Sequence, residues 1–227
     1  MNEKARLAQY VHQFKNWLNE NNTPEEIAED RVDSPSYPEW REIESFFTDL
    51  LATGAISNLD KEDQLNLLYL IARNWDIGSM IAWLSQRPVL SNLGDLSRGD
   101  FISLALVLVD QKDRAFDDAK SQFAASFSKW GVLDDEVEQI LLRFHQEADT
   151  YTQRVALQSL AKLKYPAIRS LVEQSWQVDD EHYKITCLHI IDEYMGDKEL
   201  LRQYLQKAMQ SPGNYLADYV EALWQKT

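Results

Sequence analysis

Apolar residues recur along almost the whole chain with the spacing of an amphipathic helix. The opening segment has them at positions i, i+4, i+7 and i+11, as Leu7, Val11, Phe14 and Leu18. A helix turns once every 3.6 residues, so this spacing places them on one face. Alternation typical of strands is hard to find over five or more residues. With only 7 Gly and 6 Pro in 227 residues, a turn-rich β fold is disfavoured, and the chain is predicted to be all-α.

Capping signals divide the chain into roughly eleven or twelve predicted helices. Thr23 to Glu26 has the spacing of a capping box, with proline at the first helical position. Asp60 stands in the N-cap position ahead of another apolar stripe. Ser36 to Glu39 repeats the spacing from the cap hydroxyl to the Glu seen in Thr23 to Glu26, which predicts a helix capped by Ser36 and carrying Trp40.

Residues 101–109 have no clear periodicity, because eight of the nine are apolar. A buried strand and a buried helix both fit such a run. The neighbouring segments are helical, and a lone strand would have no partner for its hydrogen bonds. We therefore predict a central buried helix here.

The last third of the chain contains a repeat. Residues 155–160 align with residues 186–191 at an offset of 31 positions. A short break and a second amphipathic helix follow each copy, and a third copy begins at Asn214. A pair of short helices cannot bury its apolar face alone, so the pairs are expected to stack.

Residues 154–163 (RVALQSLAKL), followed by Tyr165-Pro166 and a second helix, resemble a HEAT-type repeat. The resemblance covers residues 149–227 and implies a right-handed α-α superhelix whose concave face holds a protein partner. The units are shorter than the ~40 residues usual for HEAT repeats, so an irregular multi-helix bundle is the alternative. The expected organisation is one helical domain, 1–227, divided into an N-terminal portion, central helix pairs and HEAT-like repeats at 1–57, 58–148 and 149–227.

Acidic side chains are concentrated in the first two thirds of the chain. The whole sequence has 23 Lys and Arg against 37 Asp and Glu, a net charge of −14. Residues 1–150 carry 14 basic and 27 acidic side chains, whereas residues 151–227 carry a net charge of only −1. This charge disfavours binding to nucleic acid phosphates. Two interpretations stay open: the acidic surface keeps the protein soluble, or it binds a basic protein partner.

Other features indicate a cytoplasmic protein without a cofactor. A single cysteine, Cys187, excludes an internal disulfide and fits a reducing compartment. No run of 18 apolar residues and no signal-peptide pattern is present, so we expect no membrane association. The sequence also lacks Gly-rich phosphate loops, metal-binding spacings and nucleophile elbows. His189 and Asp192 are expected on a solvated face. We predict no catalytic, cofactor-binding or metal-binding residue, and no enzymatic activity.

Two irregular segments supply the candidate contact residues. Residues 29–41 form the longest aperiodic stretch, and residues 73–76 place an arginine and a tryptophan in a turn between helices. Loops often carry function, and Trp, Tyr and Arg dominate interface energetics. The alternative is that the first loop packs its own aromatic rings against the N-terminal helices. The predicted partner-binding residues are Tyr37, Trp40, Arg73 and Trp75.

Three functions are consistent with this sequence. The first is a non-enzymatic scaffold that binds another protein through its concave surface. The second is an immunity-type inhibitor that neutralises a nucleic-acid-directed toxin. The third is a DNA-processing enzyme similar to the HEAT-like alkylpurine DNA glycosylases. That family is expected to have a basic groove, and this chain offers only a modest cluster of Lys162, Lys164 and Arg169. The net charge of −14 disfavours the third function.

Overall fold

The computed structural model describes residues 2–29, 31–90, 94–210 and 213–225. Within these residues the protein is all-helical and contains no strand, as predicted. The α-helices are α1 (Glu3–Asn21), α2 (Pro24–Ala28), α3 (Trp40–Thr53), α4 (Lys61–Arg73), α5 (Ser79–Leu90), α6 (Gly94–Val109), α7 (Asp117–Phe127), α8 (Asp135–Glu147), α9 (Thr150–Lys162), α10 (Ile168–Ser175), α11 (Glu181–Ile190), α12 (Lys198–Ala208) and α13 (Asn214–Trp224). Shorter turns are η1 (Ser34–Ser36), η2 (Ala55–Asn58), η3 (Arg114–Phe116) and the π-helical η4 (Ile191–Met195).

The caps predicted at Thr23 and Asp60 are confirmed. Thr23 and Glu26 form a reciprocal capping box at the start of α2, and the Asp60 side chain accepts the backbone N–H of Asp63. The cap predicted at Ser36 is wrong. Ser36 belongs to the 3₁₀ turn η1, and its hydroxyl donates to the Asp33 carboxylate instead. Helix α3 starts later and has no side-chain cap.

The apolar run at residues 101–109 forms the greater part of α6, which confirms the predicted helix. Phe101, Leu104 and Leu108 are completely buried, and the Phe101 ring contacts Phe123 on α7 at 4.3 Å between centroids. Leu106 is exposed, so one side of this helix reaches the surface.

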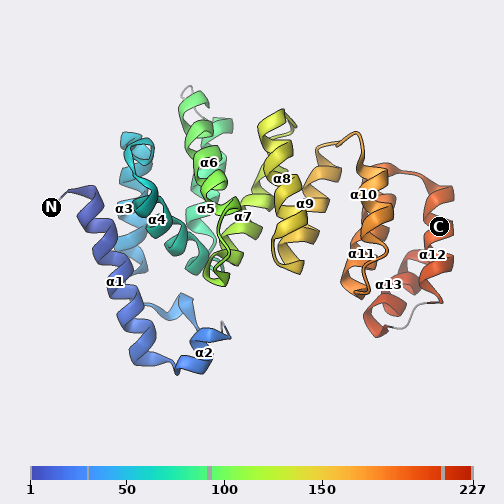
Figure 1. The fold of residues 1–227 in the computed structure, drawn as a ribbon, viewed down its shortest axis with the longest axis horizontal. Coiled ribbons are helices and arrows are strands. Elements are labelled where there is room, and N and C mark those ends of the chain that lie inside the picture. The colour runs from blue at the N-terminus through green and yellow to red at the C-terminus, as the bar shows by residue number, and fades with distance from the viewer. Residues whose placement is uncertain (1, 30, 91–93, 211–212, 226–227) are drawn as a thin grey trace.

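The helices contact one another in chain order and form two layers. In one layer, each odd-numbered helix from α3 to α13 contacts the next odd-numbered helix; in the other, α4 contacts α6, which in turn contacts α8. The long axis of the molecule follows the same order, with α1 near one end and α12 and α13 at the other (Figure 1). Helices α12 and α13 therefore lie at the end of the described molecule opposite to α1 (Figure 1).

Side-chain hydrogen bonds between elements reflect this order. In the described part of the chain, several of them join residues 35 positions apart: Ser79 to Glu44, Lys112 to Glu147, Thr152 to Asp117, Ser159 to Ala124 and Leu216 to Glu181. The odd-numbered helices from α3 to α13 begin 31 to 39 residues apart, so a separation of 35 residues corresponds to one helix pair with its turns. Each pair is thus connected to the next pair along the chain.

The buried apolar side chains form two clusters. The first reaches from Leu7 to Leu163 and the second from Leu157 to Leu223. They meet on α9, where Leu160 belongs to the first cluster and Leu157 to the second. The first cluster is continuous across the predicted boundaries after residues 57 and 148, and these boundaries stay predictions. No helix in the described ranges is long and apolar enough to cross a membrane.

A polar junction connects α8 with α9 and α10. The His145 ring places Nδ1 3.2 Å from the carbonyl oxygen of Gln153 and Nε2 3.5 Å from Oγ of Ser175. Burial away from water lowers the pKa of His145 below its ordinary value of 6.5, although the hydrogen bond to Gln153 opposes this shift. The folded protein thus favours the neutral imidazole.

We expect acid to destabilise this junction. The pKa of His145 is lower in the folded protein than in the unfolded one, so the unfolded state takes up the proton first as the pH falls. The stability that the neutral ring provides is complete above pH 6.5 and is lost below it. The urea midpoint of the wild type should therefore fall between about pH 7.5 and about pH 5.5. H145Q should show a smaller fall, and equal falls would contradict this assignment.

Candidate functional site

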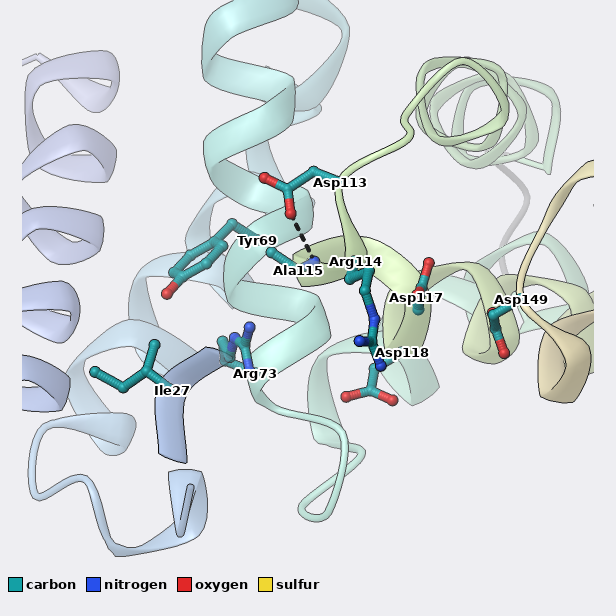
Figure 2. A pocket seen from close by; sticks show the side chains of 9 residues that line it. All are labelled: Ile27, Tyr69, Arg73, Asp113, Arg114, Ala115, Asp117, Asp118 and Asp149. Carbon is teal, nitrogen blue, oxygen red and sulfur yellow. Dashed lines mark hydrogen bonds between the residues drawn. The ribbon is translucent and has the colours of Figure 1, made fainter. Parts of the chain in front are cut away.

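Two adjacent clefts meet at Arg73 and Asp118, which line both of them. The larger has a volume of about 460 Å³ and is lined by Ile27, Tyr69, Arg73, Asp113, Arg114, Ala115, Asp117, Asp118 and Asp149 (Figure 2). The smaller has a volume of about 230 Å³ and is lined by Val32, Ser34, Ala72, Arg73, Trp75, Asp76 and Asp118. We refer to the two together as the Arg73 cleft.

Separate parts of the chain build the Arg73 cleft. Ile27, Val32 and Ser34 line it from α2 and the surroundings of η1, the C-terminal part of α4 and the turn after it contribute a second set of residues, and η3 with the start of α7 contributes a third. Asp149, the N-cap residue of α9, lies at the far end in Figure 2. These segments meet because α4 contacts both η3 and α7, while α1 contacts both α2 and α4.

Asn74, which is almost completely buried, stabilises the turn after α4. The Asn74 side-chain oxygen accepts the backbone N–H of Met80 at 3.1 Å and the hydroxyl of Ser79 at 3.0 Å. Gly78 closes the turn with φ at +69°, a left-handed conformation that glycine adopts without strain. With Asn74 directed inward, the next residue, Trp75, is directed outward and is 45% exposed.

Carboxylates outnumber cations in the Arg73 cleft, since five aspartates and two arginines line it. Three of the carboxylates are fixed by local contacts. Asp113 accepts the N–H of Ala115 at 3.0 Å, Asp149 accepts two N–H groups at the start of α9, and Asp117 pairs with Lys120 at 2.8 Å. The negative charge of the cleft is therefore held in defined positions by helix starts and an ion pair.

The Tyr69 ring lies in the wall of the cleft and already contacts two cations. The ammonium of Lys15 lies 4.8 Å from the ring centroid, and the guanidinium of Arg73 lies 5.4 Å from it. Both distances are within the range of cation–π attraction. The protein's own cations therefore already contact this ring, and the carboxylates are the groups that suit a cationic ligand.

The four predicted contact residues separate into two pairs. Arg73 and Trp75 line the Arg73 cleft. Tyr37 and Trp40 are only 4% and 5% exposed, so little of either ring is available to a partner, unlike the contact surface expected from the sequence. Their rings pack around Phe14 of α1, at 4.9 and 5.3 Å between centroids.

Trp40 is buried because this irregular loop supplies the acceptor that its indole N–H needs. Nε1 of Trp40 donates to the carbonyl oxygen of Ser34 at 2.7 Å. The Tyr37 hydroxyl donates to the Glu39 carboxylate at 3.0 Å. These contacts hold η1, and Ser34 lines the smaller part of the cleft. The two aromatic residues thus stabilise η1, which contributes to the lining of the cleft.

Other polar groups considered for chemistry lie outside the cleft. Cys187 is completely buried, and burial raises the pKa of its thiol to about 12. His189 is half-buried and packs edge-on against Tyr194. In the basic cluster, Arg169 pairs with Glu173 and Asp197 at 3.5 and 3.4 Å. Within the described residues, no three His, Cys, Asp or Glu side chains are grouped so that they could hold a metal ion.

Comparison with protein-family models, with curated proteins and with solved structures finds no match to this chain. The geometry and charge of the Arg73 cleft are therefore the basis for proposing a function.

Proposed function

We propose that this protein is a non-enzymatic helical-repeat scaffold of HEAT-like type that binds a basic segment of another protein in the Arg73 cleft. The observation that carries the proposal is the lining of this cleft: five aspartates and two arginines, with Tyr69 in the wall and the exposed Trp75 at the edge. A lysine or arginine side chain entering here would meet carboxylates and an aromatic face.

The positions of the carboxylates favour binding over simple solvation. Because Asp113 and Asp149 are held at helix starts, they lose little freedom when a cation arrives. Charge-assisted hydrogen bonds to carboxylates are about twice as strong as neutral ones. The net charge of −13 over residues 1–150 would also steer a basic partner toward this part of the molecule.

The immunity-type inhibitor is one form of the same proposal, in which the basic partner is a toxin directed at nucleic acid. The glycosylase-like alternative receives no support from the cleft. A DNA backbone would place phosphates beside the five aspartates, and like charges at such distances repel.

Affinity capture from native lysate at low and high salt tests the proposal. The bait proteins are the wild type, the charge variant D76N/D118N, the aromatic variant W75A and a control, D49N/D135N. The control removes two exposed carboxylates outside the cleft, so its net charge matches that of the charge variant.

We expect the wild type and the control to capture a basic protein in stoichiometric amount at low salt. Capture should fall in both cleft variants and at high salt, where screening weakens exposed charge pairs. The proposal is contradicted if no stoichiometric partner is found, or if the cleft variants capture the partner as well as the control does.

A further inference from the structure

The C-terminal end of the stack presents an apolar groove between α12 and α13. Its volume is about 460 Å³, and its lining includes Met209, Val220 and Trp224. Met209 is 68% exposed and Trp224 is 45% exposed, and Tyr215 at the start of α13 is also exposed. These three large apolar side chains are thus exposed on or next to α12 and α13, the helices at the end of the molecule opposite to α1 (Figure 1).

The charges on this end are balanced, unlike those on the rest of the chain. Residues 198–225 contain three basic and three acidic side chains. They are separated by helix: α12 carries Lys198, Arg202 and Lys207 with one acid, Glu199, whereas α13 carries Asp218 and Glu221 and no basic residue. Helix α12 is therefore net positive and helix α13 is net negative.

We propose that this groove is the interface of a symmetric homodimer, in which α12 of one copy lies against α13 of a second copy. A two-fold axis makes every contact occur twice, so a surface that pairs with itself must be self-complementary. A positive helix beside a negative helix satisfies this condition, since each pairs with the opposite helix of the partner. The exposed Trp224 and Met209 supply the apolar centre that such interfaces use for most of their affinity.

The distribution of charge along the stack favours the same arrangement. Residues 1–150, with their net charge of −13, extend from the opposite end of the molecule. A dimer joined through α12 and α13 keeps the two acidic portions far apart, whereas contact between the acidic portions would bring like charges together. The Arg73 cleft lies between α2, α4 and α7, so the dimer would leave it open.

Sedimentation equilibrium over a range of protein concentrations tests the dimer. We expect the wild-type mass to rise with concentration toward twice 26.4 kDa. W224E and M209E should stay monomeric with unchanged helical content by circular dichroism. The control W83E alters an exposed tryptophan on α5 and should dimerise as the wild type does. A wild type that is monomeric at every concentration, with the groove left for another protein, overturns the proposal.

Charge reversal identifies the two helices that meet. R202E/K207E makes α12 negative, and D218K/E221K makes α13 positive, so each variant alone should fail to dimerise. Mixing the two variants pairs negative α12 with positive α13, and the second half of the interface keeps its native charges. The mixture should therefore form a heterodimer. A dimer that persists in both single preparations, or a mixture that stays monomeric, overturns the arrangement.

Discussion

Replacing Trp40 with alanine is expected to lower the free energy of unfolding by about 3–5 kcal/mol, the usual range for truncating a buried tryptophan. Trp40 is 5% exposed, and its ring contacts Phe14 and Tyr37. Truncation would leave a cavity under α1 and also leave the Ser34 carbonyl without its indole donor. For a chain of this size each kcal/mol lowers Tm by about 2–4 °C. Thermal unfolding followed by circular dichroism measures the loss.

Trp75 provides the matched control, because it is the same residue type in the neighbouring irregular segment. With 45% of its surface exposed, W75A should change stability by no more than about 0.5 kcal/mol. Equal losses of stability in W40A and W75A would contradict the division into a buried supporting pair and a pair that lines the cleft.

Replacing Asp117 with alanine is expected to have an effect of similar size, for an electrostatic reason. The Lys120 side chain is only 6% exposed, and its ammonium lies 2.8 Å from the Asp117 carboxylate. Without the carboxylate, a buried charge would have lost its ion-pair partner, which destabilises proteins by about 3–5 kcal/mol. Urea unfolding of D117A measures this loss.

The Asp117–Lys120 ion pair can also be tested by comparing single and double variants. K120M removes the buried charge and keeps an apolar side chain of similar length, so it should be close to neutral. In D117A/K120M no buried ammonium is left, and most of the stability lost in D117A should return. If the double variant is as unstable as D117A, the loss comes from the start of α7 rather than from the ion pair.

The parts of the fold that depend on local sequence were predictable. Leu7 and Val11 mark the buried face of α1, and Asp60 caps α4, because periodicity and capping involve only neighbouring residues. The cap at Ser36 was not predictable in this way. The Ser36 hydroxyl has a competing acceptor in Asp33, and the backbone there is shaped by the burial of Trp40, which depends on a distant helix.

The Arg73 cleft was only partly predictable, because contacts between distant segments bring its residues together. Arg73 and Trp75 stand out because they interrupt the periodic pattern between two helices. Tyr69 lies within a helical stripe, and Asp118 looks like an acidic residue in a first helical turn, so neither carries a signal of its own. They share a cleft because α4 contacts α7, a contact between segments about 50 residues apart that no local pattern encodes.

The proposals for the Arg73 cleft and for the C-terminal groove both depend on helix pairs that stack in series. A distance measured by pulsed electron–electron double resonance tests this serial stacking. Spin labels would be attached at D49C on α3 and A222C on α13 in a C187A background, and diluted with unlabelled protein. Five helix-to-helix steps of about 8–10 Å separate α3 from α13, so we expect a single distribution centred at about 40–50 Å. A compact bundle of this length has a radius of gyration of about 17 Å, so a distribution centred near 25 Å would contradict the stack.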